Sequence, residues 1–228
     1  VDTANYRPCS ADEKLAFRHR LFAAWPEDAY VFGMVAANKG YPCRKSFPEV
    51  MEAFALFAQN HPEARLYLHS YAGSDFKGPD LQQLANHFGI MDKTRLANPR
   101  ILLAGDYTDE DMRQAYCSLD VLLSPSQGEG FCLPLLESQS CGIPVITTDH
   151  SAMSENVGYG WRVKPLRMVP TLLGGKMAET DPAVIHHAME ECWRSPQSSL
   201  TQQIARNHAL AFDWARVILL WGDFLNEM

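Results

Sequence analysis

Short apolar runs alternate along most of the chain with longer segments in which apolar residues recur every three or four positions. The apolar runs predict buried strands, and the periodic segments predict amphipathic helices. Strands are expected at 30–37, 65–69, 101–104, 121–124, 143–147 and 161–163. This alternation predicts an α/β fold, in which a Rossmann-like parallel sheet carries helices on both faces.

The helices are expected between these strands and after the last of them. Their predicted ranges are 11–25, 46–60, 80–88, 109–118, 134–141, 183–193 and 200–225. Ser46 is expected to cap the second helix in a capping box with Glu49, with Pro48 in the first turn. Residues 166–180 contain Gly and Pro and show no regular period, so the pattern assigns them no element.

The pattern divides the chain into a linker with a lead-in helix (1–26), a Rossmann-like domain (27–198) and a C-terminal closing helix (199–228). With 46% hydrophobic residues among 228, the chain can bury a sizeable core. The tryptophans expected to act as packing groups are Trp161, Trp193, Trp214 and Trp221. The formal net charge of −7 argues against a general nucleic-acid-binding protein, whose surface would be basic.

The six cysteines form no C-x-x-C pair and show no zinc-site spacing. Cys117 and Cys141 lie among apolar residues and are expected to be buried. We therefore expect reduced thiols, as in a cytoplasmic protein. The sequence contains no signal peptide and no apolar run of about 18 residues, the length that crosses a bilayer.

One segment, 124–137, carries more candidate chemistry than any other. Its sequence, SPSQGEGFCLPLLE, follows a predicted strand and leads into a predicted helix. Gly128 and Gly130 let the backbone approach a ligand closely, and unpaired amides at a helix start can bind an anion. The amides expected there are those of Phe131, Cys132 and Leu133. The segment therefore predicts a seat for a diphosphate.

Two carboxylates flank the expected diphosphate seat. Glu129 precedes the helix, and Glu137 lies one turn into it, eight positions later. By spacing alone, an exposed loop acid and an acid that favours the helix dipole would explain them equally well. A carboxylate also accepts hydrogen bonds from two hydroxyls. A ligand with phosphates in its middle and polyols at both ends, such as a nucleotide sugar, would therefore fit.

Arg44 and Lys45 supply positive charge in the loop after the first predicted strand, and His69 ends the second strand. By themselves, the two cations could be a solvated loop pair. The carboxyl ends of parallel strands meet at one edge of the sheet, where such sheets bind ligands. This loop is therefore expected near segment 124–137, with His69 at the border of the cleft. Fixed cations there would stabilise the charge that builds on a leaving diphosphate.

Four blocks resemble, in the same order, the retaining glycosyltransferases of family 4, also called group 1. They are GMVAA with RKSFP (33–48), GDYT (105–108), LDVLLSPS (119–126) and EGF, PL, E and CGIPVI (129–146). Such enzymes have the GT-B fold of two Rossmann-like domains. The resemblance covers nearly the whole chain, but only the C-terminal, donor-binding half of such an enzyme. It implies transfer of a hexose from UDP or GDP to an acceptor hydroxyl.

The resemblance also implies a role for individual residues. Glu129 is expected to contact the transferred sugar, and Glu137 the ribose hydroxyls. Lys45 is expected to bind phosphate, and Glu129, Lys45 and Arg44 are expected to act in catalysis. Tyr107 lies in the block that resembles the family's loop over the nucleotide base.

Two positions depart from the family's pattern. Cys132 stands where a glycine is commoner, and its side chain is expected to narrow the pocket. Asn38 and Lys39 stand where the family often has an arginine, so Lys39 is expected to supply the second cation. Residues 109–111 match the D-x-D metal motif of another glycosyltransferase fold, but after Thr108 they fit a capped helix start. We therefore expect no metal cofactor.

The implied partners are a nucleotide-sugar donor and the acceptor-binding N-terminal domain of the same enzyme. The Val1-Asp2 start resembles an interdomain linker. The chain alone is expected to bind donor and to turn over poorly. We expect a cytoplasmic enzyme without a nucleic-acid partner, with any contact to the inner membrane face made by the other half.

Two other classes stay open. Another GT-B enzyme, such as a sugar-nucleotide epimerase or a phosphorylase, would share the fold, although nothing marks a lysine for pyridoxal phosphate. A non-catalytic, flavodoxin-like nucleotide-binding module would share the alternating pattern. Such a module has no reason to carry two glutamates around a Gly-rich loop.

Overall fold

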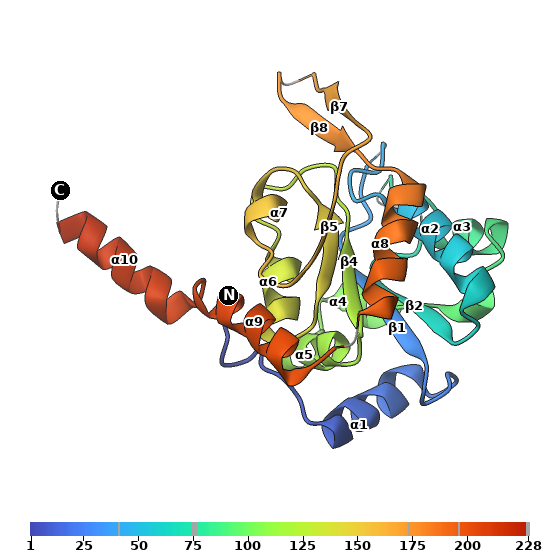
Figure 1. Ribbon diagram of the computed structural model, residues 1–228, viewed down its shortest axis with the longest axis horizontal. Coiled ribbons are helices and arrows are strands. Elements are labelled where there is room, and N and C mark those ends of the chain that lie inside the picture. The colour runs from blue at the N-terminus through green and yellow to red at the C-terminus, as the bar shows by residue number, and fades with distance from the viewer. Residues whose placement is uncertain (41, 74–76, 173, 196, 227–228) are drawn as a thin grey trace.

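The computed structural model describes residues 1–40, 42–73, 77–172, 174–195 and 197–226. At its centre is a six-stranded parallel sheet of order β3-β2-β1-β4-β5-β6 (Figure 1). The strands are β1 (Tyr30–Val35), β2 (Ala64–His69), β3 (Thr94–Leu96), β4 (Val121–Ser124), β5 (Val145–Thr148) and β6 (Gly160–Val163). The direction of winding changes between β1 and β4. The loops after these two strands therefore leave the carboxyl edge side by side.

Helices cover both faces of the sheet (Figure 1). They are α1 (Ala11–Phe22), α2 (Phe47–Asn60), α3 (Leu81–His87), α4 (Pro99–Ala104), α5 (Asp109–Cys117), α6 (Leu133–Ser140), α7 (Ala152–Glu155), α8 (Pro182–Arg194), α9 (Ser199–Leu210) and α10 (Trp214–Asn226). One hydrophobic core joins the sheet to α2, α3 and α8, and a second joins its other face to α1, α5 and α6. The predicted Rossmann-like architecture is thus confirmed.

Neighbouring strand residues point into different cores, because side chains alternate across a sheet. Val31 lies in the core with α5 and α6, and Phe32 lies in the core with α2 and α8. Because both faces of the sheet are buried, the strands appear in the sequence as continuous apolar runs. Cys117 and Cys141 are buried as predicted, and all six cysteines are free thiols.

The prediction of a strand at 101–104 is wrong. These residues lie in α4, and the third strand is β3, which pairs with β2. Asn98 caps α4 by accepting a hydrogen bond from the Arg100 amide at 3.0 Å, and Pro99 occupies the first turn. A short apolar run fits a strand or a helix equally well. Here the run is not fully buried, since Leu103 is 63% exposed.

The predicted capping box at Ser46 is also wrong. Ser46 has a φ of 59°, in the left-handed region, and its side chain caps no amide of α2. Its buried Oγ instead accepts a hydrogen bond from Thr180 Oγ1 at 2.9 Å. The Glu49 Oε2 has no hydrogen-bond partner among the described residues, and burial raises the pKa of this carboxyl. A tertiary contact has therefore replaced the local cap.

Residues 166–180, to which the pattern assigned no element, form an antiparallel hairpin. Its strands are β7 (Arg167–Pro170) and β8 (Lys176–Glu179). The hairpin projects from the domain (Figure 1). The Ala178 amide donates to the Gln127 carbonyl at 2.7 Å. This contact ties the hairpin to the loop after β4.

The C-terminal helix expected as one piece is two helices. α9 packs against α6 and buries Ala205 and Ala209. The helical conformation is interrupted at 211–213, before α10 begins. α10 projects from the domain with no buried side chain among its described residues (Figure 1). Trp214 and Trp221, expected to pack, are 58% and 60% exposed. Among the described residues, no helix combines the length and the apolar character that crossing a membrane requires.

Candidate functional site

The loops after β1 and β4 bring three of the predicted site residues together. Lys45 Nζ forms an ion pair with Glu129 Oε1, and Arg44 Nη1 lies 3.0 Å from Glu129 Oε2. Arg44 also donates to the Gly128 carbonyl, and its own carbonyl accepts from the Gln127 amide at 2.8 Å. These bonds join the two loops. We call Arg44, Lys45 and Glu129 the charge cluster.

The charge cluster is partly shielded from water, because the Glu129 side chain is only 10% exposed. Burial alone would raise the pKa of this carboxyl, but hydrogen bonds from Lys45 and Arg44 outweigh burial and lower it. Glu129 is therefore ionised at neutral pH and neutralises charge on both cations. A phosphate that enters would compete with Glu129 for them.

A cavity of 310 Å³ opens beside the charge cluster, at the carboxyl ends of β1 and β2. It is lined by Val35, Ala36, Ala37, Lys45, His69, Ser70, Tyr71, Leu102 and Pro134. The cavity lies where the winding of the sheet reverses, the position at which open parallel sheets bind ligands. Lys45 thus belongs both to the charge cluster and to the cavity wall.

Two polar residues at the end of β2 line this cavity. His69 was expected at the border of the cleft; its Nδ1 lies 2.8 Å from Tyr67 Oη, and burial lowers its pKa to about 4, so the ring is neutral. Ser70 Oγ is buried without a hydrogen-bond partner among the described residues. Buried hydroxyls are normally paired, so this one is suited to a ligand. Ser70 was missed, because a serine after a strand carries no signal of its own.

The start of α6 contributes Pro134 to the cavity wall. Cys132 is the residue before α6, with a φ of 69° and no side-chain hydrogen bond that caps the helix. Glycine adopts this left-handed conformation most easily. The Cys132 Sγ is buried 3.4 Å from Ser124 Oγ, and Cys132 does not line the cavity. The expectation that its side chain narrows the donor pocket stays a prediction.

Three other residues expected around the diphosphate seat are exposed to solvent in the loop after β4 and at the start of α6: Gly130, Phe131 and Leu133. A Cβ on Gly130 would meet nothing within 4 Å, so the backbone there is open to a ligand. Leu133 and Phe131 are 45% and 43% exposed. The Phe131 ring lies edge-on to Phe212 at 5.9 Å.

Glu137 lies on α6, one turn into the helix as expected. Its Oε2 accepts a hydrogen bond from Tyr116 Oη at 2.6 Å. Burial raises the pKa of the carboxyl, and the Tyr116 hydrogen bond opposes that rise. Among the described residues, no hydrogen bond or ion pair links Glu137 to the charge cluster, and Glu137 does not line the 310 Å³ cavity. Sequence reasoning missed Tyr116, because no local pattern pairs residues 21 positions apart.

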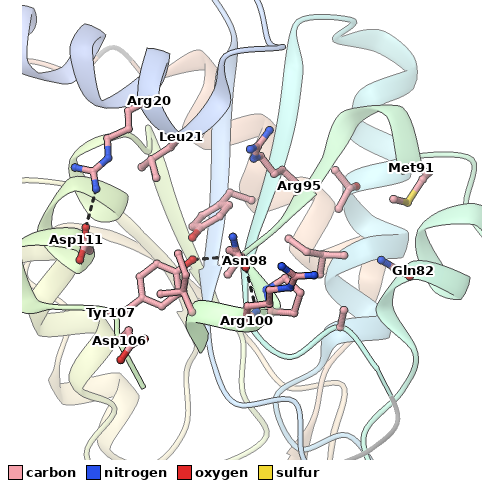
Figure 2. A pocket seen from close by; sticks show the side chains of 17 residues that line it. Arg20, Leu21, Gln82, Met91, Arg95, Asn98, Arg100, Asp106, Tyr107 and Asp111 are labelled. Carbon is pink, nitrogen blue, oxygen red and sulfur yellow. Dashed lines mark hydrogen bonds and ion pairs between the residues drawn. The ribbon is translucent and has the colours of Figure 1, made fainter. Parts of the chain in front are cut away.

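Tyr107 lines a wider groove of 880 Å³ beside β3 (Figure 2). Its ring meets the His69 ring at 4.6 Å, and its Oη accepts a hydrogen bond from the Asn98 amide at 3.0 Å. Arg95 and Arg100 also line the groove (Figure 2). The groove contains no member of the charge cluster, so the candidate chemistry lies at the smaller cavity.

Lys39 is not brought to the charge cluster. Its side chain is exposed, and its backbone forms an isolated antiparallel bridge with Lys77. Asn38 is buried and donates to the Tyr71 and Pro79 carbonyls at 3.1 and 2.7 Å. Asn38 therefore ties the loop after β1 to the segment between β2 and α3.

Residues 109–111 begin α5 as the sequence suggested. Thr108 and Asp111 form a capping box, and Asp111 Oδ1 also lies 3.1 Å from Arg20 Nη2. Asp109 accepts a hydrogen bond from Tyr6 Oη at 3.4 Å. Within the part of the chain that the structure describes, no three His, Cys, Asp or Glu residues are grouped so as to hold a metal ion.

Comparison with known proteins identifies the family. The family model described as "Glycosyl transferases group 1" matches residues 30–179. The D-inositol 3-phosphate glycosyltransferase of Salinispora arenicola is 28% identical over 231 residues, which cover 96% of this chain and 46% of that protein.

Two solved structures share the fold. The sucrose-phosphate synthase of Thermosynechococcus elongatus aligns with a TM-score of 0.74 at 20% identity, over 100% of this chain and 50% of that one. Anabaena Alr3699/HepE, in complex with UDP and glucose, aligns with a TM-score of 0.72 at 17% identity, over 100% and 55%. The chain thus spans about half the length of these relatives. By the extent of the family match, the chain belongs to the group 1 glycosyltransferases, and its Rossmann-like fold is that of GT-B enzymes.

Proposed function

We propose that this chain is the donor-binding half of a retaining glycosyltransferase, which moves a hexose from a nucleoside diphosphate to an acceptor hydroxyl. The observation that carries the proposal is the charge cluster, placed beside a 310 Å³ cavity where the winding of the sheet reverses. The fold shared with a structure that contains UDP and glucose supports a nucleotide-sugar donor.

In this proposal the diphosphate lies between Lys45 and the start of α6. Lys45 lines the cavity, and no side chain caps the first amides of α6. Arg44 is 44% exposed and reaches the phosphates from the open side, where its planar head can bind two oxygens. Fixed cations and helix amides stabilise the charge that develops on the leaving diphosphate. The reaction as proposed needs no bound metal ion.

Glu129 has two states in this proposal. In the first it pairs with both cations, as in the structure. Once phosphate pairs with Lys45 and Arg44, the carboxylate is released to accept hydrogen bonds from the transferred sugar. Departure of the diphosphate and attack by the acceptor occur on the same face of the sugar, without a protein nucleophile. The enzyme contributes positioning and charge stabilisation.

The nucleoside is assigned to the side of the cavity where Tyr107 meets His69. We propose that Glu137 binds the ribose hydroxyls through Oε1, since Oε2 is taken by Tyr116. The backbone of the loop that carries Tyr107 then faces the base. This loop decides between uracil and guanine.

We also propose that α10 packs against the acceptor-binding domain of the intact enzyme, which makes any membrane contact. Apolar side chains of α10 more than half exposed are Trp214, Ile218, Leu219, Leu220, Trp221, Phe224 and Leu225. An apolar patch of this size marks an interaction site. The first residue lies at the base of α10, because the Val1 amino group donates to the Phe212 carbonyl at 2.8 Å.

Calorimetry of the purified chain with UDP, GDP and ADP tests the proposal. We expect one of them to bind, the Glu137→Ala variant to lose binding and the Lys45→Ala variant to weaken it. Lys164→Ala is the matched control, because Lys164 is exposed after β6 and does not line the cavity. No binding by any of the three ligands would refute the donor site, and full transferase activity of this chain alone would refute the assigned acceptor domain.

A further inference from the structure

The Glu137 carboxylate is held on one side by a residue from another helix. Tyr116, near the end of α5, is fully buried, and its Oη donates to Glu137 Oε2 at 2.6 Å. Among the described residues, this is the one hydrogen bond that the carboxylate accepts from a side chain. Within the described part of the chain Oε1 accepts no hydrogen bond, so its lone pairs remain for a ligand.

The hydrogen bond has a fixed direction. Burial and the nearby Glu137 charge raise the pKa of Tyr116 well above its usual value, so the phenol keeps its proton. An ionised carboxylate can only accept, so the phenol must donate. The Tyr116 ring also packs against Tyr6, whose ring lies edge-on to it with 5.9 Å between the ring centroids. Tyr116 therefore has little freedom to follow a carboxylate that moves.

We propose that Tyr116 is a positioning residue for ribose recognition, which holds one oxygen of Glu137 so that the other faces the ribose hydroxyls. The inference rests on the proposed function. Tyr116 touches no ligand itself and acts through Glu137. The ligand class that benefits is a nucleoside diphosphate with free 2′ and 3′ hydroxyls.

The geometry explains why a second residue is needed. A glutamate side chain has several rotatable bonds, and ordering it when the ligand arrives would reduce affinity. The short bond from Tyr116 orders the carboxylate in advance. Hydrogen bonds between a neutral donor and a charged acceptor are stronger than neutral ones, so this bond is well suited to the task.

The test is calorimetry of Tyr116→Phe with two ligands: the nucleoside diphosphate that the chain binds and its 2′,3′-dideoxy analogue. We expect roughly tenfold weaker binding of the first, because the Glu137 side chain must then be ordered when the ligand binds, and no change for the second. The double variant Tyr116→Phe/Glu137→Ala should bind no more weakly than Glu137→Ala, because the two residues act as one unit.

Tyr30→Phe is the matched control. Tyr30 is also a mostly buried tyrosine, and its Oη lies 3.5 Å from Cys192 Sγ at the amino end of β1, away from the cavity. Its loss should reduce thermal stability without changing either affinity. Comparison of the two variants separates the general effect of removing a buried hydroxyl from an effect on ribose binding.

The pH profile of binding is a second readout. The Tyr116 hydrogen bond lowers the pKa of Glu137 against burial, while Asp109 raises it and the N-terminal amino group lowers it from neighbouring segments. Without the phenol, Glu137 should take up a proton at higher pH. The acid limb of the affinity profile should therefore move to higher pH in Tyr116→Phe and stay in place in Tyr30→Phe.

The possible results separate a failure of this inference from a failure of the proposed function. Wild-type affinity in Tyr116→Phe with a loss in Glu137→Ala overturns this inference alone, and so does an equal loss for both ligands. No loss in Glu137→Ala, or no binding by the wild-type chain, overturns the proposed function and this inference with it. If Tyr116→Phe does not fold, Glu137→Asp replaces it, because the shorter acid cannot reach Tyr116 and the ribose together. Wild-type affinity of that variant would also overturn the inference.

Discussion

Replacing Glu129 by glutamine should tighten the binding of a nucleoside diphosphate that carries no sugar. Glu129 pairs with Lys45 and Arg44, so a phosphate that binds these two cations must displace it. Glutamine keeps the shape of the side chain and removes its charge. The cations then become available, and the repulsion between Glu129 and the phosphates disappears.

The size of the effect follows from the charge cluster. Arg44 Nη1 and Glu129 Oε2 are 3.0 Å apart. At that separation two unit charges interact by about 5.5 kcal/mol at an effective dielectric of about 20, and by about 1.4 kcal/mol in bulk water. The lower value applies to Arg44, whose side chain is 44% exposed. With the less exposed Lys45 included and desolvation subtracted, we expect a net gain of about 1–2 kcal/mol, or roughly five- to thirtyfold in affinity.

The assay is calorimetry with the nucleoside diphosphate and with its sugar conjugate. Glu129→Gln should bind the first more tightly and should lose part of the preference for the second, because glutamine accepts sugar hydroxyls less strongly. Glu179→Gln is the matched control, since Glu179 pairs with Arg167 on the hairpin outside the cavity. Equal weakening of both ligands in Glu129→Gln would refute the idea that Glu129 competes with phosphate.

Three further predictions concern other parts of the structure. Burial lowers the pKa of His69 from 6.5 to about 4. Between these two pKa values His69 is protonated in the unfolded chain and neutral in the folded chain. The free energy of unfolding should therefore fall by about 2–3 kcal/mol as the pH falls from 7 to 4.5. Urea unfolding at pH 7 and 4.5 measures the drop, and His69→Gln should remove most of it. Cys132→Gly should keep ligand affinity and change the free energy of unfolding by less than about 1 kcal/mol, because glycine accepts a φ of 69° without strain. Cys132→Val should cost about 2 kcal/mol or more in the same urea assay, since a β-branched residue is strained there; equal stability of the two variants would contradict this. Replacing Ile218 and Trp221 by glutamine should reduce self-association in light scattering at unchanged thermal stability, because both are at least 60% exposed; unchanged association would argue against an interacting face on α10.

Local patterns were enough for five of the six strands of the sheet and for most helices. The central strands are buried on both faces, so each reads as an apolar run, as at 121–124. Thr108 and Asp111 are close in sequence, and their capping box forms as expected. In both cases the residues that decide the structure are neighbours along the chain.

The predictions that failed have other causes. Ser46 has the sequence of a cap, but its hydroxyl pairs with Thr180, which lies 134 positions away. The run 101–104 becomes a helix because Asn98 and Pro99 begin one, while β3 takes the sheet edge. The hairpin at 166–180 has no alternating pattern because β7 has no buried face. A contact between distant residues decides the Ser46 case, and one sequence does not reveal it. The run 101–104 carried a local helix signal in Asn98 and Pro99, which the strand prediction overlooked.

Some contacts of the candidate site could also be predicted from the sequence, and others could not. Parallel topology implies that the loops after β1 and β4 meet, so the approach of Lys45 and Glu129 could be predicted. The bond between Tyr116 and Glu137 depends on how α5 packs beside α6, and the place of Lys39 depends on its bridge to Lys77. Packing and loop pairing of this kind follow from the whole fold rather than from spacing.

Backbone strain gives an independent reason to locate function at this edge. Six other helices, among them α4 with the cavity residue Leu102, are capped by the side chains of Ser10, Asp80, Asn98, Thr108, Asp181 and Ser198. The helices that follow the adjacent central strands β1, β4 and β5 are not: each begins after a residue with positive φ, namely Ser46, Cys132 and Ser151, whose side chain caps nothing. Ser151 Oγ instead accepts a hydrogen bond from the Glu129 amide at 3.0 Å. A left-handed non-glycine residue is destabilising and persists where surrounding contacts enforce it, which is typical of ligand sites. Because amides left without caps favour an anion, the chain gives up helix stability in the loops where the proposed diphosphate would restore it.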